Sequence, residues 1–297
     1  MDKINLILNM ETADFDDILT LCFVGGNHPK INLRGVIITP GANDQVNLVK
    51  HVLKMLDKDI PVGVFKPNYP KNCVSDFHYK WLNKNSIQDS KYNDLGENII
   101  CQIRNSYSDI KILSGAPLGV IHKACLLNES NIINEIVIQG GFAGDNIVPP
   151  EFVLDKFKGK ITCPTFNLNG AIDAALYISN GNGVNIFKKQ YFVSKNVCHG
   201  VCYNQTMHEK LKLYKDKRIG LNLIYSGMEK YLEKHPNGKL FHDPLAACCL
   251  INKNVCNFVE GRLYRENGEW GFKQTDNTNQ YISVSLNNNE FEKTLFQ

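Results

Sequence analysis

Short apolar runs along this chain alternate with longer segments in which apolar residues recur at helical spacing. The apolar runs predict buried strands over residues 4–8, 33–38, 60–64, 110–113, 135–139 and 190–193. The segments with helical spacing predict helices over residues 16–24, 44–56, 98–105, 118–127, 171–178 and 221–232. This alternation is typical of an α/β fold, in which an open, mostly parallel, doubly wound sheet carries helices on both faces.

Two regions depart from this alternation. Residues 66–94 are polar and aromatic, and they read equally well as a binding loop or as a surface excursion with its own apolar cluster. Aromatic residues there and further on could stack on a heterocycle, although each alone is more typical of a core: His78, Tyr79, Trp81, Tyr225 and Tyr231. The tail, over residues 259–264, 270–272 and 281–284, predicts a small C-terminal β meander. We expect residues 1–297 to form a single domain.

Composition narrows the class of protein. The chain has 297 residues, 43% of them hydrophobic and 21% charged, as in globular proteins that bury a sizeable core. A net charge of +3 argues against nucleic acid as a partner. No apolar run approaches the roughly 18 residues of a spanning helix, and no secretory pattern opens the chain, so we expect a cytoplasmic protein without a membrane partner. Most of the ten cysteines have apolar neighbours, which favours reduced thiols.

Four carboxylates stand within seven residues where the first predicted strand meets the first predicted helix: Glu11, Asp14, Asp16 and Asp17. Acids in the first turn of an N-capped helix are favourable, which accounts for one or two of them. Four acids so close together repel one another unless a cation neutralises them, and oxygen ligands of this kind suit Ca²⁺ or Mg²⁺. The stretch therefore favours a metal-binding or catalytic site.

Other features are expected at the same edge of the sheet. The turn after residue 113 contains Gly115, and the strand over residues 135–139 ends in a glycine pair. Ligands of open parallel sheets bind at the carboxyl ends of the strands, where glycine permits close approach. Further on, His242 and Asp243 precede a proline at the expected first helical position, so Asp243 is either an N-cap or a carboxylate delivered to this edge. Cys198-His199-Gly200-Val201-Cys202 lacks a second ligand pair at zinc spacing, so zinc is not predicted.

The order of these motifs resembles the inosine–uridine-type nucleoside hydrolases. The stretch from Asn9 to Asp17 is similar to that family's D-x-D-P-G-x-D-D motif, with Asn9 and Glu11 in place of aspartates and one residue inserted. Further similar segments follow in the family's order: Ser114-Gly115-Ala116-Pro117-Leu118, Val137-Ile138-Gln139-Gly140-Gly141, Phe166-Asn167 through Asp173-Ala174-Ala175, Val197-Cys198-His199, and His242-Asp243-Pro244-Leu245-Ala246.

The resemblance implies hydrolysis of the N-glycosidic bond between ribose and a nucleobase, assisted by Ca²⁺. Glu11, Asp17 and Asp243 would be calcium ligands, together with a backbone carbonyl of Ser114 or Gly115. The resemblance also suggests a homodimer or homotetramer.

Roles in catalysis and substrate binding are implied in the same way. Glu11 takes the place of the carboxylate that activates water, and His242 lies where a family histidine is near the leaving base. Asp16 and Asn167 would bind ribose hydroxyls, and Asn43 and Asn146 are further candidates for substrate contacts.

One departure concerns the 5′ end of the substrate. Thr165 stands where the family has a glutamate that contacts the ribose 5′-hydroxyl. Loss of that carboxylate removes repulsion against a 5′-phosphate or larger group, so we hypothesise a nucleotide-like or otherwise 5′-modified substrate. Two alternatives are a catalytically weak nucleoside-binding protein on the same fold and a metal-dependent phosphatase. The phosphatase lacks an evident lysine partner and leaves His242 and Asp243 unexplained.

Overall fold

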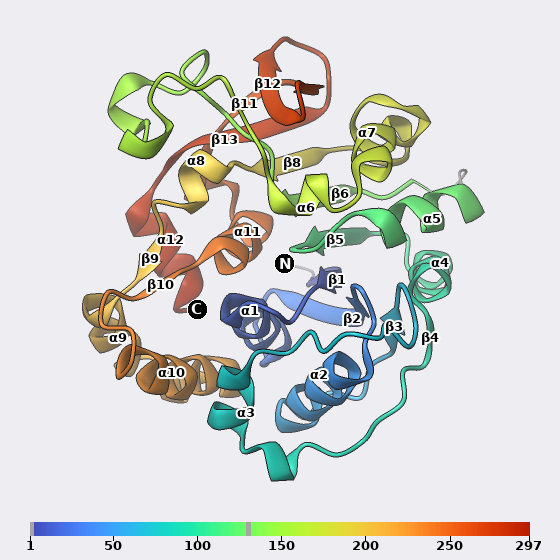
Figure 1. The fold of residues 1–297 in the computed structure, drawn as a ribbon, viewed down its shortest axis with the longest axis vertical. Helices are drawn as coiled ribbons and strands as arrows, with labels where there is room; N and C mark the ends of the chain where they lie inside the picture. Colours follow the sequence, from blue (N-terminus) through green and yellow to red (C-terminus); the bar gives the residue numbers. More distant parts are fainter. Residues whose placement is uncertain (1–2, 129–131) are drawn as a thin grey trace.

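Eleven strands form one sheet in the order β4-β3-β2-β1-β5-β6-β8-β13-β11-β12-β7, and two more form a separate ribbon, β10-β9 (Figure 1). The computed structural model describes residues 3–128 and 132–297. The strands are β1 (Ile4–Met10), β2 (Ile31–Ile38), β3 (Val62–Val64), β4 (Asp94–Leu95), β5 (Ile110–Ser114), β6 (Glu135–Gln139), β7 (Thr162–Cys163), β8 (Gln190–Val193), β9 (Cys202–Tyr203), β10 (Lys239–Leu240), β11 (Cys256–Glu266), β12 (Glu269–Gln274) and β13 (Gln280–Leu286).

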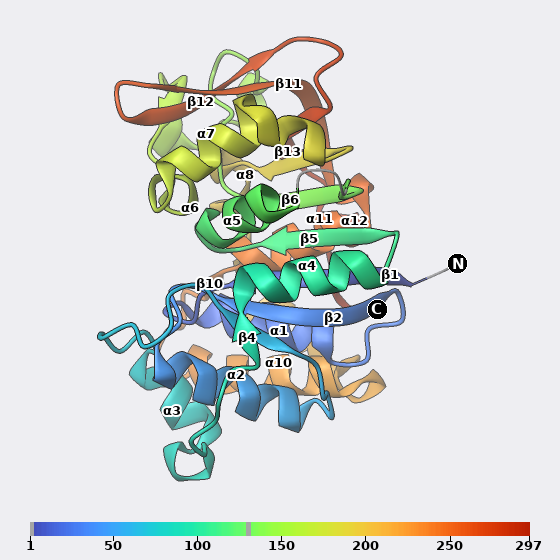
Figure 2. The same cartoon turned by 90° about the vertical axis from the view of Figure 1, so that its right-hand side faces the viewer.

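Helices cover both faces of this sheet (Figure 2). They are α1 (Phe15–Gly25), α2 (Asn43–Met55), α3 (Asp76–Leu82), α4 (Gly96–Ser106), α5 (Gly119–Leu127), α6 (Phe166–Asn169), α7 (Ile172–Asn180), α8 (Lys195–Cys198), α9 (Gln205–Lys212), α10 (Ile219–Leu232), α11 (His242–Ile251) and α12 (Asn288–Leu295). Apolar residues of α1, α2, α10, α11 and α12 share one core, and those of α4, α5 and α7 share the other. The predicted α/β class is therefore confirmed.

Strand β1 lies near the middle of the sheet and fixes where the acidic stretch emerges. It pairs in parallel with β2 on one side and β5 on the other. Leu6 and Ile7, which point to opposite faces, are both fully buried, one in each core. An apolar strand buried on both faces ends where its sequence turns polar, and Glu11 is the first residue beyond it.

The C-terminal strands extend the main sheet instead of forming a separate meander. Strand β11 pairs antiparallel with both β12 and β13, and β13 joins the parallel part of the sheet through β8. The antiparallel strands are as predicted, but their order, β13-β11-β12, is not the consecutive order of a meander. The long strand β11 has two edges, so it accepts a partner on each.

The polar and aromatic segment over residues 66–94 contains helix α3. Its residues Phe77, His78 and Trp81 pack against α1, whereas Tyr79 is half-buried beside Lys84. Phe15 of α1 is the centre of this cluster, with ring centroids 5.3 Å from Trp81 and 5.5 Å from Tyr231. His78 lies beside them, and Tyr225 stacks on His208 elsewhere in the core. These rings hold α3 and α10 against α1, as expected for aromatic residues that belong to a core.

Helix α11 begins two residues before the position that its proline suggests. His242 is its first residue and Phe241 precedes it as the N-cap, so Asp243 is not an N-cap but lies inside the first turn. A proline in the first turn is tolerated because the backbone N–H groups there have no intrahelical acceptor. Within residues 3–128 and 132–297, no helix has the length and apolar character needed to cross a membrane.

Candidate active site

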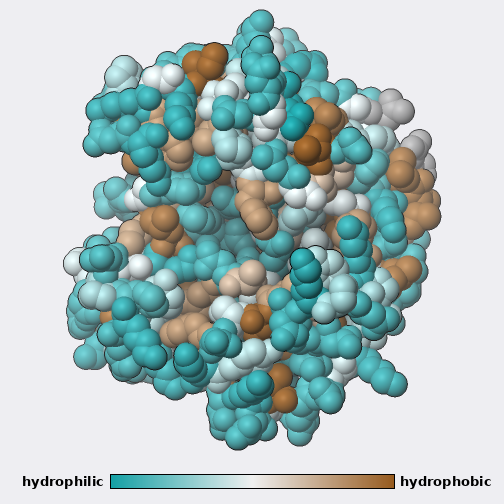
Figure 3. All heavy atoms as spheres, in the orientation of Figure 1, coloured by the Kyte–Doolittle hydropathy of each residue, from teal (hydrophilic) through white to brown (hydrophobic). Residues whose placement is uncertain are grey.

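A cavity of about 360 Å³ opens at the carboxyl ends of four adjacent strands. Glu11 follows β1, Gly115 follows β5, Gly140 follows β6 and Lys195 stands just beyond β8. Figure 3 shows a largely hydrophilic hollow near the middle of the molecule, in the orientation of Figure 1. Its volume is within the range of about 300–1,000 Å³ usual for small-molecule sites.

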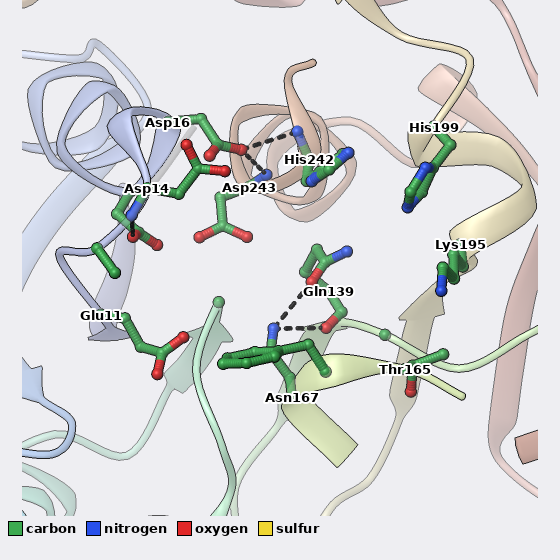
Figure 4. A pocket seen from close by; sticks show the side chains of 15 residues that line it. Glu11, Asp14, Asp16, Gln139, Thr165, Asn167, Lys195, His199, His242 and Asp243 are labelled. Atoms are coloured by element: carbon green, nitrogen blue, oxygen red, sulfur yellow. Dashed lines mark hydrogen bonds between the residues drawn. The ribbon is translucent and has the colours of Figure 1, made fainter. Parts of the chain in front are cut away.

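Five carboxylates form one side of this cavity: Glu11, Asp14, Asp16, Asp17 and Asp243 (Figure 4). The first four come from the β1–α1 junction, and the fifth comes from the first turn of α11. The sequence prediction that Asp243 reaches this edge therefore agrees with its position.

Asp16 joins the two segments. Its Oδ2 accepts hydrogen bonds from the backbone N–H of His242 at 2.9 Å and of Asp243 at 3.1 Å. Its other oxygen lies 3.3 Å from the Nζ of Lys239. Burial raises the pKa of Asp16 to about 6 despite the nearby Lys239 ammonium. The carboxylate thus fixes the start of α11 while it lines the cavity.

Asp14, the residue without a predicted role, is the N-cap of α1. Its carboxylate accepts from the N–H of Phe15 at 2.6 Å, and its own N–H donates to Asp17 at 3.1 Å in a capping box. Its side chain is 56% exposed and pairs with Lys239 at 2.9 Å. Burial acts to raise the pKa of Asp14, but Lys239 outweighs it and the pKa is lowered.

Asp17 and Asp243 are both buried and lie against each other at the centre of the acidic side. Burial is the main cause that raises the pKa of each well above its ordinary value, and neighbouring carboxylates add to it. Two buried carboxylates in contact cannot both ionise at low cost without a positive counter-charge. A Cβ at Gly115 would overlap the carboxylate of Asp243, so only glycine leaves room for it over the β5 turn.

These donors fit a hard divalent cation. Asp17, Asp243 and Glu11 offer carboxylate oxygens on one side of the cavity, and the glycine turn after β5 brings backbone into reach. Burial raises the pKa of Glu11 to about 7, so this carboxylate too gains from a neighbouring cation. The side-chain hydroxyl of Ser114 is used elsewhere, since it accepts from Asn9 and donates to the carbonyl of Ala116.

Asn9 has a structural task that an aspartate could not perform in the same way. Its Nδ2 donates to the Oγ of Ser114 at 2.9 Å, and its Oδ1 accepts from the hydroxyl of Thr39 at 3.2 Å. The side chain is fully buried and joins the ends of β1, β2 and β5. The amide therefore holds the acidic edge in place without adding a charge to it.

Asn167 is the only one of the three predicted asparagines that lines the cavity in the described part of the chain. Its Nδ2 donates to the side-chain and backbone oxygens of Gln139, at 2.8 and 3.0 Å, which leaves its carboxamide oxygen to accept from a ligand. Asn146 instead donates to the carbonyl of Phe272 at 2.9 Å. Asn43 is exposed in the first turn of α2. The structure does not bring these last two residues to the cavity.

Two stacked histidines form the upper wall in Figure 4. The rings of His242 and His199 are 4.7 Å apart. Burial lowers the pKa of His242 to about 4 and that of His199 to about 3, so both rings are neutral near pH 7. Nε2 of His242 is buried without a hydrogen-bond partner, whereas Nδ1 of His199 accepts from the Nζ of Lys156 at 2.7 Å.

These histidines and Cys198 place three potential ligand atoms within 4.8 Å of one another. A soft metal there would need the Cys198 thiolate, but burial raises the pKa of this thiol to about 12. The Nζ of Lys156 also donates a hydrogen bond to Nδ1 of His199, and its positive charge opposes the binding of a metal cation there. The carboxylates are therefore the better metal-binding group, and Cys202 is not part of the cluster.

The wall opposite the carboxylates contains residues that sequence reasoning did not assign to binding. Gln139 and Lys195 line it beside Thr165 (Figure 4), and Phe166 also lines the cavity. Lys195 could have been found, because it closely follows a predicted strand whose carboxyl end must lie at the edge of the sheet. Gln139, the last residue of a predicted strand, carries the same signal, whereas Phe166 follows no predicted strand and is 74% exposed at the site.

The chain is similar to known proteins over nearly its whole length. The family model described as "Inosine-uridine preferring nucleoside hydrolase" matches residues 6–293. One relative, an uncharacterized protein from Aquifex aeolicus (strain VF5), is 28% identical over 280 residues, which are 90% of each chain.

Solved nucleoside hydrolases share the fold. An inosine-guanosine nucleoside hydrolase superposes with a TM-score of 0.74 at 14% identity, over 98% of this chain and 97% of its own. The plant nucleoside hydrolase PpNRh1 gives 0.71 at 14% identity, over 99% and 98%. A purine-preferring ribonucleoside hydrolase from Gardnerella vaginalis gives 0.70 at 15% identity, over 98% of both chains. With the family model spanning almost the whole length, the chain belongs to the inosine-uridine preferring nucleoside hydrolase family and is a hydrolase of N-glycosyl bonds.

Proposed function

We propose that this protein hydrolyses the N-glycosidic bond of a ribonucleoside or a 5′-substituted nucleoside, with Ca²⁺ as its metal. The observation that supports it best is the buried contact between Asp17 and Asp243 over Gly115, because this pair requires a counter-charge. Glu11, Asp17, Asp243 and a backbone carbonyl of the β5 turn at Ser114 or Gly115 would hold the ion. When bound, the ion lowers the pKa of coordinated water and neutralises the carboxylates.

The ribose is held by residues on two walls. Asp16 retains accepting capacity beside its two backbone hydrogen bonds and can take a hydrogen bond from a ribose hydroxyl. Asn167 offers its carboxamide oxygen from the opposite wall, where Gln139 fixes its orientation. Contacts from both sides hold the sugar in one position and orient its C1′ atom, which reduces the entropic part of the barrier.

Glu11 and His242 act at the bond that breaks. Water attacks C1′ while Glu11 accepts its proton, and the bond from C1′ to the base nitrogen breaks as positive charge develops on the sugar. The surrounding carboxylates stabilise that charge. A neutral imidazole can donate one hydrogen bond, so His242, whose Nε2 has no partner in the protein, can stabilise the departing base.

We also propose the form in which the protein acts. Residues 1–297 would constitute a single domain that acts in the cytoplasm as a homodimer or homotetramer. The substrate would be a small molecule and not a nucleic acid. Light scattering with size-exclusion chromatography would measure the oligomeric state, and a monomer at all concentrations would contradict that part.

A catalytically weak nucleoside-binding protein is the second candidate, because Glu11 is one methylene longer than the family's aspartate. Release of free base from a panel of nucleosides and 5′-substituted nucleosides, with and without Ca²⁺, separates the two. An enzyme releases base in many turnovers per protein molecule. Calorimetric binding of nucleosides without turnover would instead favour the binding protein.

A further inference from the structure

The cavity has one acidic side and one basic side. Among the described residues that line it, Lys195 is the only lysine or arginine, and it lies across the cavity from the five carboxylates (Figure 4). Its Nζ donates to the carbonyl of Pro164 at 2.9 Å and makes no ion pair within the described part of the chain. Its ammonium group therefore has hydrogen atoms left for a ligand.

A buried hydroxyl belongs to the residue that follows the carbonyl bound by this ammonium group. Thr165, the residue after Pro164, is only 3% exposed and lines the cavity, yet its Oγ1 has no hydrogen-bond partner. A buried hydroxyl left unsatisfied costs about 1–3 kcal/mol in typical proteins, so a ligand atom at this position would relieve that cost. Lys195 and Thr165 both offer donors, which suits an anion.

A second ammonium group adds to the positive charge. Lys156 and Lys195 flank the buried ring of Phe157, with their Nζ atoms 5.2 Å and 6.0 Å from its centroid. Lys156 also holds Nδ1 of His199 at 2.7 Å, so the proton of this neutral ring is on Nε2. The closest acid along that segment, Asp155, pairs with Lys158 instead. The positive charge is thus not neutralised locally.

We propose that Lys195 and Thr165, with Lys156 behind them, form a binding site for the 5′-phosphate of a nucleoside 5′-monophosphate. This inference rests on the proposed function, because Asp16 and Asn167 must hold the ribose for its 5′ end to reach this wall. Asn167 is two residues from Thr165, so the groups that bind the sugar and the anion are adjacent. The phosphate also stays away from the carboxylates, which would repel it.

The reaction that follows leaves the phosphate ester intact. The oxygen of water forms a bond with C1′, the bond from C1′ to the base nitrogen breaks, and the two protons of water end on the sugar hydroxyl and on the base. The products are a free base and ribose 5-phosphate. A reaction that consumes a pentose phosphate can use the product directly, without a kinase step.

The test compares kcat/KM for a nucleoside and for its 5′-monophosphate in matched variants. The ratio of monophosphate to nucleoside should exceed one in the unaltered protein and fall about tenfold or more in Lys195→Ala, as expected for loss of a charge-assisted hydrogen bond. Thr165→Glu should invert the preference. Lys189→Ala is the control, since it removes the same charge from an exposed side chain at the opposite end of β8, outside the cavity, and it should leave the ratio unchanged.

Several outcomes would overturn the inference. One is efficient hydrolysis of nucleosides with no use of monophosphates. Another is an equal loss for both substrates in Lys195→Ala, which would mean that this lysine contacts the base or sugar. If neither substrate is hydrolysed, the proposed function fails, and calorimetry with ribose 5-phosphate and ribose then tests the site alone. Weaker binding of ribose 5-phosphate in Lys195→Ala supports the site, and equal binding of both sugars contradicts it.

Discussion

The carboxylate of Asp16 accepts a hydrogen bond of 3.1 Å from the backbone N–H of Asp243, 227 residues further along the chain. A second hydrogen bond, from the N–H of His242, reaches the same oxygen. One side chain of the acidic stretch thus sets the position of the helix that supplies the distant carboxylate and the histidine. Changes at Asp16 should therefore affect both stability and the site.

Replacing Asp16 with alanine should lower the free energy of unfolding by about 1–3 kcal/mol, because two buried N–H groups lose their acceptor. Asp16→Asn keeps an accepting oxygen and should lose less. Denaturant unfolding of the two variants measures the difference. Equal stability of both variants and the unaltered protein would show that these hydrogen bonds do not hold α11.

Asp17→Asn should abolish Ca²⁺ binding and catalysis together. In the unaltered protein stripped of metal, added Ca²⁺ should raise the melting temperature, since a ligand at about 100 times its Kd adds about 2.7 kcal/mol. The variant should show no such rise, while its amide oxygen still caps α1 through the N–H of Asp14. Retained calcium affinity in Asp17→Asn would count against this ligand assignment.

Gly115→Ala should reduce activity by about a hundredfold or more, because the added methyl group displaces the Asp243 carboxylate. Gly25→Ala provides the matched control. Its Cβ would meet only side-chain methyl groups, the nearest of them on Leu56 at 3.1 Å, and it is the last residue of α1, at the end of the helix away from the cavity. Steady-state rates and melting curves for both variants check this. Full activity in Gly115→Ala would mean that Asp243 need not sit over the turn.

His242→Ala should reduce hydrolysis of natural nucleosides by about 10²–10³-fold, the usual contribution of one positioned hydrogen-bond donor that stabilises charge developing in the transition state. A nitrophenyl riboside, whose leaving group needs no such donor, should lose much less. Initial rates on both substrates test the role. A uniform loss across the two would indicate that His242 binds the substrate without assisting the leaving group.

The parts of this molecule that sequence predicts are those set by local pattern. Apolar runs located the central strands, and the rule that ligands bind at their carboxyl ends placed Asp16 and Asp17 at that edge. The residues alone left Asp243 open between an N-cap and this edge, and only the family resemblance implied that it joins the other acids. Helix α11 begins two residues earlier than predicted, because a proline fits several positions of a first turn. Asn146 could not be placed from sequence, because its segment lies in an irregular stretch whose path depends on contacts such as that with Phe272.

The positively charged side of the cavity, which contains Lys195, was not predicted from the sequence for a different reason. A lysine on a surface is ordinarily solvated, so Lys156 carries no signal of its own, and the position of Lys195 after a predicted strand indicates only that it lies near the edge of the sheet. Two features of the structure indicate an anion site. Both ammonium groups lie near the ring of Phe157, and the hydroxyl of Thr165 has no hydrogen-bond partner. Only the tertiary structure shows that Lys195 and Thr165 face five carboxylates across one cavity, with Lys156 beside Phe157.

Product analysis in water labelled with heavy oxygen tests the central claim most directly. The purified protein would be given Ca²⁺ and a nucleoside or its 5′-monophosphate, and the products would be analysed by mass spectrometry. Hydrolysis at the N-glycosidic bond predicts base and sugar in equal amounts, with the label at the C1 hydroxyl of the sugar and none in the base. An absence of free base from every substrate, or label in the base or in released phosphate, would contradict the account.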